Sequence, residues 1–580
     1  MFRLYKKYLK KNLHLVILGP IFKVIEAIFE LLVPFVIKNM IDKGINNDLL
    51  SSSEKRRYIY EQGGLLLAFA VIGLCSTLVC QFIASRVSQT FGTDVRNDFF
   101  KHINTLSFKE LDNLQASSII NRATNDIYNV EKSVAMLIRL VIRSPLIVIG
   151  SICLAFYIDS LMGIVFLVTS IIIFLIFALI TKLSFPNNKK VQKKMDKVLT
   201  KTRDSLNGER QVRAFRKEEY EKSSFTNENT ELTKLQIFVG KINALLNPLT
   251  FVVVNLAIVL VMYIGGIKIS TSRFTQGDIQ ALINYLNQIF IAIVAITGLV
   301  QVFSKAHASS LRINEVFDMK SSIIDGEFEA PLDTDTIIEF DNVTFKYNDN
   351  ASPALDNVSF KIKKGETIGI IGGTGSGKTT IVNLINRFYD TTEGSVYYLG
   401  RNVKDYKYSF INHEISTVLQ HATLFNGTIE SNLKWGSKNA SLEDLKEALK
   451  IAQAEFVLDK GLDSRVLEGG QNLSGGQRQR IGIARAILKK GNVIILDDSS
   501  SALDYQTDYR LRMALKELNI TTIIISQRAQ AISYADKILV LDNGKLVGFD
   551  KHLELIKNNT VYQEICESQE VEVRRWNSIY

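Results

Sequence analysis

Long apolar stretches separated by polar segments make up the first half of the chain, whereas the second half alternates short apolar runs with helix-forming segments. A helix needs roughly 20 apolar residues to cross a bilayer core of about 30 Å. Five stretches reach this length with few charges: Leu65–Ala84, Val134–Tyr157, Leu161–Ile180, Leu249–Ile267 and Ile279–Phe303. The pattern therefore predicts a helical membrane domain in the first half.

A further apolar stretch, about Leu13–Ile37, is less uniform because it carries Lys23, Glu26 and Glu30. We count it as a sixth span, because an even number of spans returns the chain to the side on which it began. The polar segments 85–133 and 181–248 are rich in helix formers, so we expect the spans to continue through them as helices into the cytoplasm.

A change in composition near residue 320 separates the two halves. The segment 318–336 mixes charges with Gly326 and Pro331, which is typical of a linker. Beyond it, short β-rich runs alternate with helical patterns, as an α/β domain requires. The predicted organisation is a transmembrane domain with six helices and two long cytoplasmic loops at 1–317, a linker at 318–336 and a nucleotide-binding domain at 337–580.

The 580 residues carry a formal net charge of +10, which raises the question of a nucleic-acid partner. Many basic residues instead flank membrane spans, as in cytoplasmic loops. They are Arg3, Lys6, Lys7, Lys10 and Lys11, followed by Lys189, Lys190, Lys193, Lys194, Lys197 and Lys201. This placement argues against a nucleic-acid partner and predicts that both termini lie in the cytoplasm. Lys55, Arg56 and Arg57 do not follow this pattern, because they lie in an expected outer loop.

A phosphate-binding loop follows a buried-strand pattern at 367–371 and precedes a helical segment. Its residues are Gly372, Gly373, Thr374, Gly375, Ser376, Gly377, Lys378, Thr379 and Thr380. Glycines let successive backbone N–H groups curl around phosphate at a helix N-terminus. Lys378 then reaches the β- and γ-phosphates, and Thr379 offers a hydroxyl to Mg²⁺. The strand, loop and helix context makes this a nucleotide site rather than a simple glycine-rich turn.

A second strand pattern at 493–496 ends in Asp497. A carboxylate at this place, paired with an upstream phosphate-binding loop, is expected to hold Mg²⁺ directly or through water. The predicted cofactors are therefore ATP and Mg²⁺.

Between these motifs lies Leu473-Ser474-Gly475-Gly476-Gln477, followed by a helical run. This LSGGQ segment resembles the signature of ATP-binding-cassette (ABC) transporters. As a helix N-terminus with free amides, it forms a second anion site, where Ser474, Gly475, Gly476 and Gln477 are available to a γ-phosphate.

Other positions match the same family in order along the chain. The resemblance implies that Tyr347 stacks on adenine, that Gln420 serves both Mg²⁺ and catalysis, and that Ser501–Asp504 forms the D-loop, with Glu468 in the loop before the signature. Ser118–Asp126 and Gln211–Glu221 look like the intracellular loops that carry ATP-driven closure to the membrane helices.

The membrane-first order resembles an exporter half-transporter with the type I exporter fold, also called type IV. The resemblance implies a multi-pass protein of a bacterial cell membrane, working in the lipid bilayer on a small-molecule substrate. It also implies dimers with two nucleotides between one subunit's phosphate-binding loop and the other's signature, so one chain supplies half of each site.

Two positions depart from the family pattern. Asp498 follows Asp497 where a glutamate normally acts as general base, and its side chain is shorter by one methylene. A displacement of about 1 Å can cost on the order of 10²-fold in rate, and loss of general-base assistance about 10²–10⁴-fold. Gln527 stands where the family has a histidine. With both changes beside an intact signature, the chain resembles the degenerate subunit of heterodimeric, multidrug-type exporters. The candidate catalytic residues are Asp498, Gln527 and Gln420.

Several alternatives stay open at this stage. A nucleotide-gated channel or regulator would use slow hydrolysis, although the chain lacks an added regulatory segment, and an importer built on the exporter fold would share every motif. Fold-level analogy does not identify a substrate, so haem, porphyrin, peptide and lipid compete with a small amphipathic or hydrophobic drug.

Charged residues inside the apolar spans give one clue to the substrate, because such charges are costly. Arg139 and Arg143 lie four residues apart in the third span, which would place them on one helical face. They are expected either to form structural ion pairs with Glu26 or Glu30, near Lys23, or to line a pathway for substrates that bear an anionic group.

Overall fold

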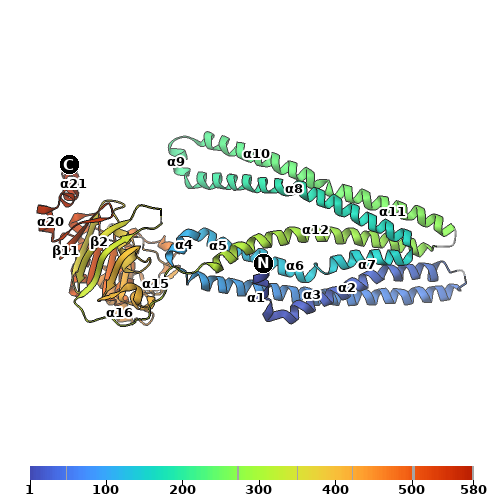
Figure 1. The fold of residues 1–580 in the computed structure, drawn as a ribbon, viewed down its shortest axis with the longest axis horizontal. Helices are drawn as coiled ribbons and strands as arrows, with labels where there is room; N and C mark the ends of the chain where they lie inside the picture. Colours follow the sequence, from blue (N-terminus) through green and yellow to red (C-terminus); the bar gives the residue numbers. More distant parts are fainter. Residues whose placement is uncertain (48, 271–273, 349, 421, 500–502, 578–580) are drawn as a thin grey trace. The chain divides into compact units, whose positions relative to one another are not determined.

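The computed structural model describes residues 1–47, 49–270, 274–348, 350–420, 422–499 and 503–577 (Figure 1). The chain divides into two compact units. The helical unit comprises Met1–Asn104 and Ala116–Asp318, and the α/β unit comprises Thr105–Gln115 and Met319–Tyr580.

Long helices build the helical unit. They are α2 (Leu13–Asn39), α3 (Ser52–Ile103), α6 (Ile127–Arg139), α7 (Arg143–Ile158), α8 (Ser160–Asn207), α10 (Glu218–Ala244), α11 (Leu246–Ser270) and α12 (Gln276–Asp318), with α1 (Phe2–Tyr8), α5 (Ala116–Asn121) and α9 (Glu209–Ala214) as short additions. Side-chain caps define where two of them begin: Ser51 and Glu54 form a capping box at α3, and Asp159 accepts the Leu161 and Met162 amides at α8.

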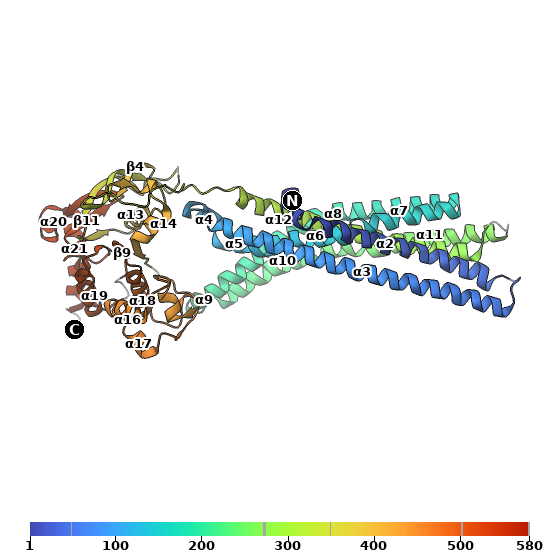
Figure 2. The same cartoon turned by 90° about the horizontal axis from the view of Figure 1, so that it is seen from below.

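The polar segments continue the apolar spans as helices, which confirms that expectation. Helix α3 runs on to Ile103 and α8 to Asn207 without interruption. Helices α8 and α10 then lie side by side, joined at one end by α9 (Figures 1 and 2).

Among the described residues, five helices are long and apolar enough to cross a membrane. Counted across the short breaks within 116–158 and 218–270, their bounds are Ser52–Ile103, Ala116–Ile158, Ser160–Asn207, Glu218–Ser270 and Gln276–Asp318. Each contains one of the five uniform apolar stretches. The expected first span is a helix of 27 residues, Leu13–Asn39, but its charges keep it outside this group. The count of six spans therefore stays a prediction.

Two sheets form the core of the α/β unit. The strands are β1 (Thr336–Phe345), β2 (Leu355–Lys363), β3 (Thr367–Gly372), β4 (Glu393–Tyr398), β5 (Arg401–Asn402), β6 (Ile415–Val418), β7 (Gly427–Thr428), β8 (Arg465–Val466), β9 (Val493–Asp497), β10 (Thr521–Ile525), β11 (Lys537–Asp542) and β12 (Lys545–Asp550). The larger sheet has the order β12-β11-β3-β10-β9-β6, parallel except for the edge strand β12, and the smaller has the antiparallel order β2-β1-β4-β5. Strands β7 and β8 pair with each other in a separate two-stranded antiparallel sheet.

Helices of the α/β unit follow these strands. They are α13 (Lys378–Ile385), α14 (Tyr408–Glu414), α15 (Ile429–Leu433), α16 (Leu442–Ile451), α17 (Phe456–Lys460), α18 (Gly475–Leu488), α19 (Tyr505–Glu517), α20 (His552–Asn558) and α21 (Thr560–Asn577). Strands β3, β9 and β10 are neighbours in the larger sheet and run parallel, so their carboxyl ends meet at one edge. Ligands of open α/β sheets bind at that edge.

One short helix from the first half of the sequence belongs to the α/β unit. Helix α4 (Phe108–Leu114) places Phe108 against Phe388, with ring centroids 4.6 Å apart, and Asp112 accepts a hydrogen bond from the Tyr389 hydroxyl. The prediction that this segment belongs to the domain at 1–317 was wrong, because α4 packs within the α/β unit. Sequence position alone could not show where an amphipathic loop helix docks.

Candidate nucleotide site

The phosphate-binding loop joins β3 to α13 with the geometry that its glycines permit. Gly375 and Gly377 have φ values of +81° and +102°, and a Cβ on Gly377 would lie 2.6 Å from the carbonyl oxygen of Ala354. Lys378 donates to the carbonyl oxygens of Gly372 (2.9 Å) and Gly373 (2.7 Å), which closes the loop on itself. Within the described chain the buried hydroxyl of Ser376 has no hydrogen-bond partner, which leaves a donor in the loop for a ligand.

A cavity of about 170 Å³ brings the predicted site residues together, although they are far apart in sequence. It is lined by Thr374, Gly375, Lys378, Thr379, Gln420, Asp497, Asp498, Ile525 and Gln527. The ends of β3, β9 and β10 supply most of this wall. The arrangement combines a cation, two carboxylates and two side-chain amides at one sheet edge.

Asp497 lies at the buried end of β9, with 4% of its surface exposed. Burial raises the pKa of its carboxyl group, and the charge of Asp498 raises it further, whereas Lys378 and the Thr379 hydroxyl lower it. Burial in turn lowers the pKa of the Lys378 ammonium, although the two carboxylates oppose this effect. These opposing charges leave the cavity able to accept both a phosphate and a cation.

Asp498 has left-handed backbone geometry, with φ of +47°, and its N–H donates to the carbonyl oxygen of Ile525 (3.0 Å). Gln420 donates from Nε2 to Asp498 Oδ2 over 3.4 Å. Burial raises the pKa of Asp498, while Gln420, Lys378 and Arg528 lower it. The carboxylate therefore faces the cavity at the place that its sequence position predicts.

The oxygen groups of Thr379 and Asp497 suit Mg²⁺, which prefers hard oxygen ligands and usually keeps water and phosphate oxygens as well. Among the described residues, no group of three or more His, Cys, Asp or Glu side chains could hold a metal ion by itself. The residues fit a metal that shares its coordination with a nucleotide.

Tyr347 lies beside α13, at the back of the phosphate-binding loop. Its hydroxyl is 3.2 Å from Thr380 Oγ1 and accepts a hydrogen bond from Asn383 (3.1 Å). Its ring makes edge contacts with Phe345 and Tyr389 at centroid distances of 4.8 and 5.3 Å, and the side chain is 39% exposed. These contacts hold the Tyr347 ring in place, and its exposed surface is available to a planar ligand.

The signature residues lie apart from this cavity, which none of residues 474–477 lines. Ser474 caps α18 in a capping box with Gln477: the Gln477 N–H donates to Ser474 Oγ (3.2 Å), and the Ser474 N–H donates to Gln477 Oε1 (3.0 Å). Glu468 begins a short 3-10 helix, Glu468–Gly470. Of the expected D-loop, Ser501 and Ala502 lie outside the described residues, and Asp504 caps α19.

Sequence analysis missed two residues beside this site. Arg528 follows Gln527 directly and lies close enough to Asp498 to lower its pKa, and its basic charge next to the predicted cavity could have revealed it. Gln569 holds the same loop from α21, and no local pattern indicates that contact.

The charged residues of the membrane helices form a second cluster, in the helical unit. Arg143 contacts Glu30 at 2.6 Å and Glu26 at 3.5 Å, and Lys23 pairs with Glu26. The expected pairing with these glutamates is thus confirmed for Arg143.

The expectation that Arg139 and Arg143 share one helical face was wrong. Arg139 ends α6 and Arg143 begins α7, and the non-helical Leu140 (φ −122°) breaks the helix between them. In the described chain Arg139 has no ion pair, and its buried Nε has no hydrogen-bond partner. Lys23 and Arg143 therefore pair with the two glutamates, whereas Arg139 pairs with neither.

A nucleotide site at the edge of a parallel sheet, fused to a bundle of membrane helices, defines a membrane-bound, ATP-powered protein. The family model for the ABC transporter transmembrane region matches residues 16–294, and the ABC transporter model matches 355–501. The ABC transporter ATP-binding protein YfiB of Bacillus subtilis is 34% identical over 94% of both chains. This chain belongs to the ABC transporter family.

Two further comparisons refine the class. The chain is 29% identical, over 94% of both chains, to an ATP-dependent lipid A-core flippase of Photorhabdus laumondii. The structure of a bacterial Atm1-family ABC exporter with ATP bound superposes with a TM-score of 0.77 over 97% of this chain and 98% of that one, at 23% identity, which shows the shared fold. The protein is an ABC transporter with the type I exporter fold, whose ATPase domain couples ATP hydrolysis to transport.

Proposed function

We propose that this chain is one half of a heterodimeric exporter and that its own ATP site binds nucleotide but hydrolyses it slowly. The observation that carries the proposal is the pairing of Asp498 and Gln527 in one cavity with an otherwise complete site. An aspartate reaches less far than a glutamate, and a glutamine lacks the imidazole that could share a proton. Both hydrolytic positions are therefore weakened together.

The binding residues would retain their full function. Lys378 and the loop 372–380 hold the phosphates, Tyr347 stacks on adenine, and Thr379, Gln420 and Asp497 hold Mg²⁺. Bound Mg²⁺ would supply charge neutralisation for the phosphates. Within the chain, Asp498 and Gln420 remain able to orient a water, although the aspartate reaches less far towards it than a glutamate would.

The signature supports the partner role. Ser474, Gly475, Gly476 and Gln477 occupy a capped helix N-terminus that is separate from the chain's own cavity. The capping box uses the Ser474 and Gln477 amides, so the Gly475 and Gly476 amides are available to the nucleotide of a second half-transporter. That partner would supply the glutamate and the histidine that this chain lacks.

The experiment compares ATPase turnover of the purified chain with that of the chain co-expressed with its cognate half. Turnover should rise by at least about tenfold on co-expression, given the size of general-base effects. Full-rate hydrolysis by a verified homodimer would contradict the proposal.

We infer further that the substrate is a small amphipathic molecule with an anionic group. Arg139 supports this inference, since it contributes an uncompensated cation beside a helix break, and irregular backbone at membrane depth occurs where it is buried in protein or lines a cavity. The 29% identity to an ATP-dependent lipid A-core flippase is in keeping with a lipid-like substrate of this class.

A further inference from the structure

The C-terminal helix α21 contacts the ATP site through one side chain. Gln569 donates from Nε2 to the carbonyl oxygen of Gln527 (2.7 Å), and its Oε1 accepts from the N–H of Ala529 (2.8 Å). These two backbone groups lie on either side of Arg528. One side chain therefore fixes three consecutive residues of the loop that follows β10, which we call the switch loop (residues 526–529).

The chemistry of this contact requires a primary amide. The loop offers one acceptor and one donor, and an amide supplies one donor and one acceptor from the same planar group. A carboxylate could accept from Ala529 but would face the Gln527 carbonyl without a proton, and an apolar side chain could do neither.

Helix α21 is itself firmly placed on the α/β unit. Tyr562 is fully buried, and its hydroxyl lies 2.7 Å from Nδ1 of His552 on α20. Ile565 and Cys566 pack against the hydrophobic core, and Gln569 follows on the same helical face, seven residues after Tyr562. The amide is thus presented to the loop by a buried anchor rather than by a free tail.

The opposite side of the switch loop is held by the sheet. The Ser526 N–H donates to the carbonyl oxygen of Ile370 on β3 (3.1 Å), and the Arg528 N–H donates to Ser526 Oγ (2.9 Å). Between these supports Gln527 lines the ATP cavity together with Asp498. The loop is therefore clamped between β3 and α21, with the Gln527 side chain at the wall of the cavity.

We propose that Gln569 is a positioning residue for ATP hydrolysis, which fixes the backbone of the switch loop so that Gln527 stays in the cavity. The inference rests on the ATPase activity of the α/β unit and is independent of whether the transporter is a heterodimer. A small displacement of a group beside the reacting phosphate lowers the rate of hydrolysis. Lys378 and Tyr347, which would bind the nucleotide, lie outside the switch loop, so loss of the Gln569 contact should leave nucleotide binding unchanged.

The test uses the full chain in lipid nanodiscs with three variants. Gln569→Ala removes both hydrogen bonds, Gln569→Glu keeps only the acceptor, and Glu567→Ala changes an exposed residue of the same helix as a matched control. In Gln569→Ala, hydrogen exchange of the Ala529 amide should accelerate about 5- to 30-fold, because its acceptor is lost. Turnover at saturating Mg-ATP should fall in both Gln569 variants while the KM for ATP stays within twofold of the parent value, since only positioning is changed.

Any of the following results would overturn the proposal. They are unchanged Ala529 exchange in Gln569→Ala, an equal effect from Glu567→Ala, and a higher KM with unchanged turnover. Parent turnover in Gln569→Glu would also overturn it, because that variant cannot donate to Gln527.

Discussion

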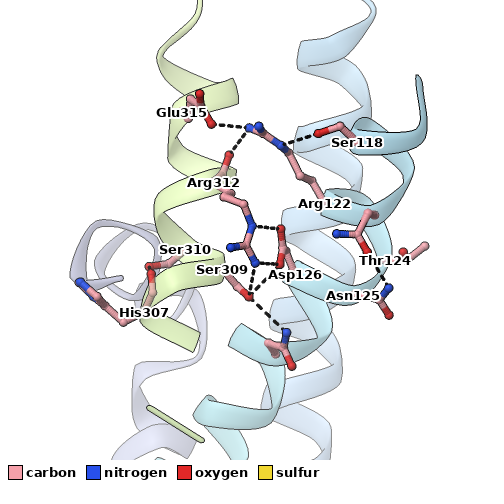
Figure 3. Close-up of polar contacts among 12 residues, drawn as sticks. Ser118, Arg122, Thr124, Asn125, Asp126, His307, Ser309, Ser310, Arg312 and Glu315 are labelled. Atoms are coloured by element: carbon pink, nitrogen blue, oxygen red, sulfur yellow. Dashed lines mark hydrogen bonds and ion pairs between the residues drawn. The ribbon is translucent and has the colours of Figure 1, made fainter. Parts of the chain in front are cut away.

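Asp126 accepts a two-pronged hydrogen bond from the guanidinium of Arg312, which joins the loop after α5 to the end of α12 (Figure 3). Arg312 Nε lies 2.8 Å from Oδ2, Ser309 donates to Oδ1 at 2.8 Å, and Asp126 is only 1% exposed. The carboxylate sits at the end of a π-helical turn, Arg122–Asp126, in the segment that resembles an intracellular loop. This segment follows α4 of the α/β unit, and α12 leads into the linker, so Asp126 ties together two chain segments that connect the units.

Replacing Asp126 by alanine should destabilise the helical unit by about 1–3 kcal/mol, because Arg312 and Ser309 lose the buried acceptor of their hydrogen bonds. Glu315→Ala is the matched control, since Glu315 pairs with Arg122 (2.7 Å) but has a side chain that is 55% exposed, and its loss should cost below about 1 kcal/mol. Thermal unfolding in detergent measures both. Equal losses would show that burial of Asp126 does not determine its contribution.

The two ATP sites of the proposed heterodimer should respond unequally to substitution. Gly476→Glu places a bulky anion at the N-terminus of α18 and should abolish most transport, since this signature completes the partner's site. Asp498→Ala should retain much more activity, because that residue contributes little to hydrolysis. ATPase and vesicle-uptake assays compare the two, and equal losses would refute a degenerate site.

The folded α/β unit should lose stability as pH rises through the pKa values of Asp497 and Asp498. Both pKa values are raised above the ordinary 3.8, first by burial, so the folded state holds these protons longer than the unfolded state does. Asp498→Asn removes one charge and, with it, part of the rise in the pKa of Asp497. We expect this variant to unfold at a higher temperature than the parent at pH 7 without nucleotide, with the difference vanishing near pH 3, as differential scanning fluorimetry can measure. A lower unfolding temperature at pH 7 would contradict the assignment.

The sequence predicted those features that depend on local spacing. The loop 372–380, Asp497 at a strand end and the helix N-terminus at the signature each follow from a few adjacent residues whose chemistry has one structural solution. The docking of α4, the break between Arg139 and Arg143 and the bond from Gln569 to the switch loop depend on tertiary contacts. No periodicity encodes such contacts, so they became visible only in three dimensions.

Arg139 and Arg143 should respond differently to replacement by alanine, and this difference tests the proposed substrate class. Arg143 is held by Glu26 and Glu30, so its removal leaves Glu30 without a cation and Glu26 with Lys23 alone, and should lower expression and thermal stability.

Arg139 has no such partner among the described residues, so Arg139→Ala should preserve folding and basal ATPase. It should reduce stimulation by anionic amphipathic substrates more than stimulation by cationic ones, because the cation for their charged group is gone. Substrate-stimulated ATPase in nanodiscs, measured with a matched anionic and cationic detergent-like pair, gives the comparison. If Arg139→Ala instead collapses expression and neutralising Glu26 or Glu30 restores it, Arg139 belongs to the structural network and the anionic substrate class loses its support.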